Sequence, residues 1–290
     1  MHGVRLIAGR PPADSIDVNS RLILCGDDFG RSAVINDAIL ALASKGKLTA
    51  ASVRVNEPFV AQGAAALAEL PDFDLGLHIA LTDGTAITGS SDFAPNGILP
   101  TIDQLTVDAY LQCVSHERVA SEIAHQFDAF ETLFGRPPDY VGAHQHVQLI
   151  PSIRALVLNA AVRRNPRMWV RNCEEKFATI ARRGSYPARA WFVALLSHGL
   201  RRDAAKRRLR TNDGFAGLYD LRTPGAFEDR FADFLHLAGR PNHLIICRPA
   251  VRAERGDETG SARLSEYHFL LSDQVAEMAA ARRLTIGAFR

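Results

Sequence analysis

The side chains best suited to chemistry in this chain are two neighbouring carboxylates and two histidines far apart in the sequence. Asp27 and Asp28 come directly after a short apolar segment, and His78 and His144 lie in or directly after two later ones. One carboxylate and two imidazoles can bind a divalent cation and still leave coordination positions open for water and substrate. Asp28, His78 and His144 are therefore candidate ligands of one divalent metal ion. The set suits Zn²⁺, and other divalent ions such as Mg²⁺ are also compatible.

A bound cation would give Asp27 a role beside these ligands. Such a cation lowers the pKa of its water toward ~7 and polarises a carbonyl group, so Asp27 is a candidate general base acting on that water. Each residue also has a purely structural explanation. An Asp pair commonly caps a helix, here one beginning near Ser32, and a lone histidine on an apolar strand is usually a core residue. Three such positions at strand ends together favour the metal site.

Further polar residues follow other apolar segments. Arg248 offers a planar, permanently charged fork suited to an oxyanion or an acidic group, and His146 is able to transfer protons. Asn56, Arg171 and Phe215 are candidates for substrate contact. A salt bridge explains Arg171 equally well, and a tight turn explains the segment around Phe215 equally well.

Strand-like segments that alternate with helix-like ones must position these residues. The strand-like segments are Arg21–Cys25, Ala51–Val55, Leu75–Leu81, Tyr140–Ala143, Met168–Val170, His243–Cys247 and Leu284–Ile286. The alternation predicts an α/β fold of parallel strands, either a barrel or a doubly wound sheet. No glycine-rich nucleotide-binding motif follows any strand. In a barrel, all strand carboxyl ends share the face that carries the active site, and the polar residues fall at those ends.

The composition excludes several other classes of protein. Of the 290 residues, 47% are hydrophobic, and 34 Lys and Arg against 32 Asp and Glu leave a net charge of +2, too balanced to indicate a nucleic-acid partner. The four cysteines form no C-x-x-C pair, which argues against a zinc ribbon and a disulfide framework. No apolar run reaches the ~18 residues of a membrane span, and no signal peptide is apparent, so we expect a cytoplasmic protein. We expect one domain over 21–290 after an N-terminal extension over 1–20.

Several short motifs carry a family resemblance. The segments CGDDFG (25–30), GLHIAL (76–81) and AHQHVQ (143–148) resemble the three motifs of the YdjC-like carbohydrate deacetylases, which include chitooligosaccharide deacetylases and the hopanoid-associated HpnK branch. The resemblance continues through 48–56, 211–220 and 263–272. It implies an irregular (β/α) barrel that removes an acetyl group from an N-acetylated amino sugar. It also implies that Asp28, His78 and His144 are the metal ligands and Asp27 the catalytic base.

Two positions depart from that family pattern. Gln148 stands where the third motif often has a further histidine, and Arg248-Pro249-Ala250 stands where the family usually has His-Pro-Gly. Arginine keeps its proton because its pKa lies above ~12, so it cannot protonate a leaving amine. Proton delivery would then fall to His146 or to Asp27, while Arg248 would stabilise an oxyanion or bind an acidic group. A catalytically altered or inactive relative that binds a sugar or lipid headgroup is therefore the alternative. A sugar-phosphate isomerase on a similar barrel is a third possibility, although it usually needs more carboxylate ligands.

The segment near 177–210 interrupts the alternation with a basic helical insertion. Apolar residues including Trp191 and Leu195 precede the run RRDAAKRRLR at 201–210. Such a helix can lie on anionic lipid, which would place the protein peripherally at the inner membrane surface and suit a glycolipid substrate such as an N-acetylglucosaminyl hopanoid. A barrel helix with an apolar stripe packed inside and a solvated basic face explains it as well. The oligomeric state stays open, a homodimer included.

Overall fold

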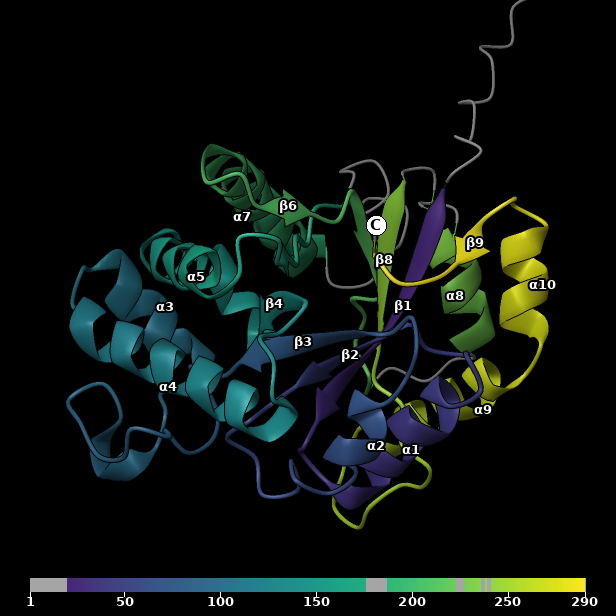
Figure 1. The fold of residues 1–290 in the computed structure, drawn as a ribbon, viewed down its shortest axis with the longest axis horizontal. Helices are drawn as coiled ribbons and strands as arrows, with labels where there is room; N and C mark the ends of the chain where they lie inside the picture. Colours follow the sequence, from purple (N-terminus) through teal and green to yellow (C-terminus); the bar gives the residue numbers. More distant parts are fainter. Residues whose placement is uncertain (1–19, 176–186, 223–226, 236–237, 239–240, 290) are drawn as a thin grey trace, which may run out of the picture.

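A curved parallel sheet forms the centre of the molecule in a computed structural model (Figure 1). The structure describes residues 20–289 except 176–186, 223–226, 236–237 and 239–240. The strands are β1 (Arg21–Phe29), β2 (Ala50–Val53), β3 (Asp74–Ile79), β4 (Tyr140–Ala143), β5 (Trp169–Val170), β6 (Arg210–Thr211), β7 (Gly214–Ala216), β8 (Asn242–Cys247) and β9 (Thr285–Ile286). Their order is β6-β5-β4-β3-β2-β1-β8-β7, with β9 paired to the start of β1, and every ladder is parallel. The predicted barrel-like α/β fold is confirmed.

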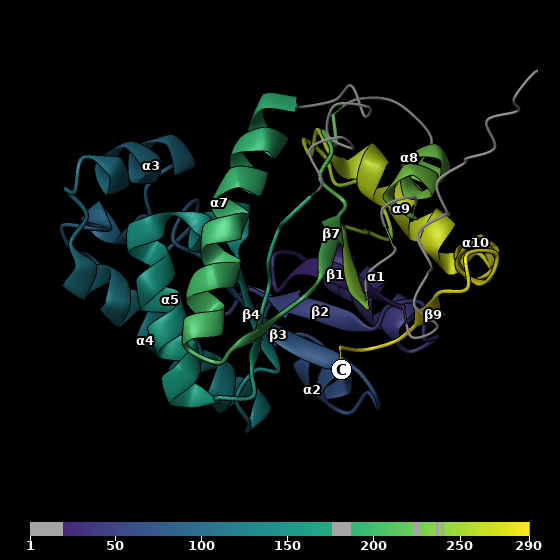
Figure 2. The same ribbon diagram turned by 90° about the horizontal axis from the view of Figure 1, so that it is seen from above.

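Helices surround this sheet, as Figures 1 and 2 show. They are α1 (Ala33–Ala43), α2 (Ala64–Ala68), α3 (Ile102–Tyr110), α4 (His116–Phe134), α5 (Pro151–Arg164), α7 (Pro187–Lys206), α8 (Phe227–Leu235), α9 (Gly260–Leu271) and α10 (Gln274–Ala280), with 3₁₀ turns η1 (Pro95–Gly97) and η2 (His144–Leu149). Helix α4 shows how residues in the sequence set where a helix begins and ends. Ser115 caps its first turn by accepting from the Arg118 N–H, and Gly135 ends it with φ +66°, a conformation that glycine adopts without steric cost.

The sheet is open between β6 and β7, two short strands that the sequence pattern missed. Only Asn212 and Asp213 separate them, so no helix crosses over at this point. The Asn212 side chain spans the gap instead: its Nδ2 donates to the carbonyls of Asn172 and Gly214 at 2.8 Å each, and its Oδ1 accepts from the Asn172 N–H at 2.7 Å. The segment around Phe215, for which a tight turn was an equal explanation, is therefore strand β7.

The basic insertion contains helix α7, which packs against α5 and η2. Ala194, Ser197 and Leu200 are fully buried on this packed side, whereas Leu195 is 62% exposed. Arg154 of α5 donates to Asp203 at 3.1 Å across the contact. The described part of α7 is thus a barrel helix with one packed face. The side chain of Trp191 and the start of the insertion lie outside the described residues, as does the extension over 1–19.

No helix in the described part of the chain combines the length and apolar character needed to cross a bilayer.

Candidate active site

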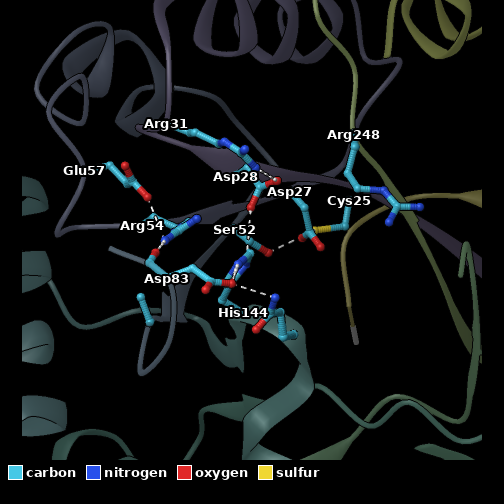
Figure 3. A network of polar contacts seen from close by, with 12 residues as sticks. Cys25, Asp27, Asp28, Arg31, Ser52, Arg54, Glu57, Asp83, His144 and Arg248 are labelled. Carbon is cyan, nitrogen blue, oxygen red and sulfur yellow. Dashed lines mark hydrogen bonds and ion pairs between the residues drawn. The ribbon is translucent and has the colours of Figure 1, made fainter. Parts of the chain in front are cut away.

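A bulge at the end of β1 turns two successive carboxylates into one cavity. The register runs from Gly26 opposite Ala51 to Phe29 opposite Val53, so β1 holds one residue more than β2 there. Asp28 takes the left-handed conformation, φ +71°, which aspartate tolerates better than most residues. In a regular strand, neighbouring side chains point to opposite faces. Because the bulge breaks this alternation, Asp27 and Asp28 both line the same cavity (Figure 3).

Asp28, His78 and His144 come together at the carboxyl ends of β1, β3 and β4. Each offers a donor atom, and the three donor atoms lie within 4.8 Å of one another. Asp28 Oδ1 lies 3.9 Å from His144 Nδ1, and the two imidazole rings are 5.9 Å apart between centroids. The buried Nδ1 of His78 has no hydrogen-bond partner among the described residues. An unsatisfied buried imidazole nitrogen beside a carboxylate fits a cation site, because only a bound group would complete its contacts.

The electrostatics keep these three side chains in the protonation states that a metal ion would need. Burial lowers the pKa of His78 to about 4 and that of His144 to about 3, so both imidazoles are neutral near pH 7. Burial alone raises the pKa of Asp28, but the surrounding charges, the Arg263 guanidinium first among them, together outweigh burial and hold the pKa well below its usual range. Two neutral imidazoles and one carboxylate are the protonation states that a divalent cation requires.

Asp27 is held from beneath by Arg171, which follows β5. The guanidinium Nη1 donates to Asp27 Oδ2 at 2.9 Å, and Nη2 donates to Oδ1 at 2.7 Å. Nη2 also donates to Ser52 Oγ at 2.5 Å, and Gly142 leaves room for the guanidinium beside β4. Burial by itself raises the pKa of Asp27, yet the Arg171 charge and hydrogen bonds bring that pKa well below its usual range. Asp27 is therefore ionised and fixed in orientation.

The cavity above these residues has a volume of about 380 Å³. Both Arg248 and His146 line it. The Arg248 Nη2 donates to the Gly217 carbonyl at 2.6 Å, its guanidinium lies 5.1 Å from the centre of the Tyr219 ring, and its Nε has no hydrogen-bond partner in the described part of the chain. His146 Nδ1 lies 3.3 Å from Cys173 Sγ. Figure 3 shows Asp27 and Asp28 between Arg248 on one side and Arg31 and Arg54 on the other.

The three residues expected to contact substrate do not line this cavity. Arg171 is fully buried under Asp27, and Phe215 is buried with its ring edge against His146 at 5.8 Å between centroids. Asn56 donates to the Thr85 carbonyl at 3.0 Å. Asn56 and Arg171 follow β2 and β5 as the sequence predicted, whereas Phe215 lies within β7, and all three side chains make contacts within the protein.

Gln148, at one of the two departures from the family pattern, is also buried. Its Nε2 donates to the Arg171 backbone carbonyl at 3.2 Å. The Gln148 side chain therefore holds the backbone at Arg171 and does not line the cavity.

Sequence reasoning missed the residues that surround the ligands. Arg263 of α9 donates to Asp28 Oδ2 at 3.3 Å, and Tyr219 forms part of the cavity wall. Asp83 Oδ2 lies 3.9 Å from His144 Nε2 and accepts from Gln145 Nε2 at 2.7 Å. Arg263 and Tyr219 fall within the later segments that carried the family resemblance, which was the available signal. No local pattern marked Asp83.

The protein is an α/β barrel-like chain in which one carboxylate and two imidazoles converge at the carboxyl ends of parallel strands. A family model for YdjC-like protein matches residues 21–281, and the chain belongs to that family. It is 27% identical over 274 residues to a chitooligosaccharide deacetylase of Yersinia pestis (strain Pestoides F), covering 92% of this chain and 97% of the relative. It is 33% identical over 150 residues to a chitooligosaccharide deacetylase of Enterobacter sp. (strain 638), covering 51% and 58%.

Among solved structures, the fold is similar to that of a proposed cellobiose-phosphate cleavage protein from Enterococcus faecalis V583. The TM-score is 0.68 at 18% identity, over 93% of this chain and 97% of the other.

Proposed function

We propose that this protein is a metal-dependent hydrolase that removes the acetyl group from an N-acetylated amino sugar. The observation that carries the proposal is the convergence of Asp28, His78 and His144 within 4.8 Å, beside the ionised Asp27. The Yersinia and Enterobacter relatives, which are chitooligosaccharide deacetylases, support the substrate class. When bound by the three ligands, a cation such as Zn²⁺ or Mg²⁺ supplies an acidified water and polarises the amide carbonyl.

The residues of the chain then divide the proton transfers. Asp27 accepts a proton from the attacking water, and the Arg171 fork keeps its carboxylate aimed at the cavity. The leaving amine takes a proton either from Asp27 or from a protonated His146, which lines the same cavity; in the second case Asp27 returns its proton to solvent. Arg248 cannot donate a proton, and its role in this proposal is to stabilise the developing oxyanion from the cavity wall.

A glycolipid is the substrate that a second feature favours. A mainly apolar groove of about 500 Å³ runs between α3, η2 and α7 and shares Gln145 and His146 with the cavity. Val107 on its wall is 55% exposed. An apolar aglycone joined to the sugar, as in an N-acetylglucosaminyl hopanoid, would find burial there while the acetamide lies at Asp27. Such a substrate suits a protein at the periphery of a membrane.

Acetate release tests the proposal. The purified chain with added Zn²⁺ or Mg²⁺ should release acetate from N-acetylglucosamine oligosaccharides or from glycolipid conjugates. A chelator should abolish the release, and Asp27→Asn should lower it at least ~100-fold because the proton acceptor is lost. Tight sugar binding without turnover would instead favour the non-catalytic relative. A sugar product formed without acetate would favour the isomerase.

A further inference from the structure

Helix α9 carries two charged side chains, one turn apart, that are almost completely buried. These are Arg263 and Glu266. Glu266 accepts from the Arg248 backbone N–H at 2.5 Å and from the Tyr219 hydroxyl at 2.5 Å. A buried charge is costly unless partners replace the lost water, so the partners of these two residues show what α9 holds in place.

The Arg263 guanidinium joins the ends of β1 and β8. Its Nη2 donates to Asp28 Oδ2 at 3.3 Å, its Nη1 to the Arg248 carbonyl at 3.4 Å, and its Nε to Thr259 Oγ1 at 3.1 Å. The other carboxylate oxygen of Asp28, Oδ1, lies 3.9 Å from His144 Nδ1. The two oxygens of Asp28 therefore have different neighbours, arginine for one and the histidine cluster for the other.

Local structure alone does not fix the Asp28 carboxylate in this way. Asp28 lies in a bulge at φ +71°, outside the regular ladder. Arg31 also approaches Oδ2, at 3.8 Å, but its side chain is 47% exposed and its charge is screened by water. Among the described residues, Arg263 is the buried arginine that donates a hydrogen bond to this carboxylate.

We propose that Arg263 is a positioning residue that orients Asp28 so that Oδ1 faces the cation shared with His78 and His144. The inference rests on the proposed function because it concerns the cation of that site. The planar Arg263 guanidinium has three hydrogen-bond partners, so it can fix the orientation of the Asp28 carboxylate. A lysine ammonium cannot do so, because it is a single point charge on a flexible chain. Partners behind metal ligands typically contribute ~10–100-fold in metal affinity.

The test separates orientation from charge. Arg263→Lys keeps the positive charge and loses the fork, and we expect it to weaken Zn²⁺ affinity at least ~10-fold, measured by calorimetric titration of the full chain with Zn²⁺ alone. Arg263→Gln removes a positive charge beside the cation. If only charge mattered, the Arg263→Gln variant would bind Zn²⁺ more tightly than wild type. If Arg263 orients the Asp28 carboxylate, the variant should bind Zn²⁺ more weakly. Glu266→Gln is the matched control: it lies on the same buried face without contacting Asp28 and should stay within ~3-fold of wild type.

Thermal unfolding of the metal-free variants shows whether each is folded when titrated. Wild-type affinity in folded Arg263→Lys, or increased affinity in Arg263→Gln, overturns the proposal. If Arg263→Lys does not fold, Arg263→Gln still decides. The proposed function fails separately: a wild-type chain that binds Zn²⁺ through Asp28 but releases no acetate rejects the hydrolase and leaves the role of Arg263 standing. Acetate release combined with unchanged Zn²⁺ affinity in both Arg263 variants rejects the role of Arg263 and leaves the hydrolase standing.

Discussion

Two arginines that follow strands of the same sheet, Arg171 after β5 and Arg248 after β8, have different surroundings. Arg171 is fully buried, with both terminal nitrogens on the Asp27 carboxylate. Arg248 lines the cavity, where a carbonyl and the Tyr219 ring hold it. A guanidinium with both terminal nitrogens on a carboxylate fixes that carboxylate, whereas the Arg248 guanidinium donates to a backbone carbonyl, although the Glu266 carboxylate binds the Arg248 backbone N–H nearby. Residue type and strand position do not distinguish the two.

Replacing Arg171 should have the largest effect. Arg171→Met leaves Asp27 buried and unpaired, so we expect a loss of about 3–5 kcal/mol in the free energy of unfolding and a loss of acetate release of at least ~10³-fold. Urea unfolding and an acetate assay measure the two. Adding Asp27→Asn to Arg171→Met should recover much of the stability and none of the activity. A single variant as stable as wild type would show that the ion pair does not hold Asp27.

Replacing Arg248 should affect the reaction more than the fold. Arg248→Met removes the charge nearest the buried Glu266 carboxylate, but Glu266 keeps its hydrogen bonds from the backbone N–H of residue 248 and from the Tyr219 hydroxyl, so we expect a smaller loss in the free energy of unfolding than for Arg171→Met. We expect kcat to fall ~10²–10³-fold, as when one oxyanion donor is lost. Measuring kcat and KM separately checks the role, since a rise in KM alone would indicate binding of an acidic substrate group. A stability loss as large as that of Arg171→Met would remove the contrast between the two arginines.

Asp74 shows what burial does to a carboxylate that forms no ion pair with an arginine in the described part of the chain. Burial raises its pKa to about 6, although Oδ2 accepts from the Phe289 N–H at 2.8 Å. The folded state therefore holds the Asp74 proton more tightly than the unfolded chain, whose pKa is about 4. This contribution to stability is present below pH ~4 and is lost as the pH rises through about 6.

Asp74→Asn, which keeps the acceptor oxygen, tests that sign. The variant should exceed wild type by about 1–2 kcal/mol in the free energy of unfolding at pH 7, and the difference should vanish near pH 4. Urea unfolding between pH 4 and 8 measures it. A variant that is less stable than wild type at pH 7 would show that ionised Asp74 does not lower the free energy of unfolding.

The strands that carry the site were predictable because they are apolar and bounded by polar residues. β1, β3, β4 and β8 were found within a few residues, although β1 runs on through Asp27 and Asp28 to Phe29. β6 (Arg210–Thr211) and β7 (Gly214–Ala216) were missed because they are short and lie in no apolar run, whereas the equally short β5 and β9 lie in apolar segments. Asp28, His78 and His144 were placed by strand ends and family resemblance, and their cation-binding role stays a prediction.

The sequence by itself determined the alternation of strands and helices, and with it the edge of the sheet at which the reactive side chains gather. That information is local, because apolar periodicity and turn residues act over a few positions. Only the tertiary structure decided which arginine forms an ion pair with which carboxylate. Arg171 is 144 positions from Asp27 and Arg263 is 235 from Asp28. Contacts over such separations depend on how strand ends pack together, and a bulge at one residue sets where a carboxylate points.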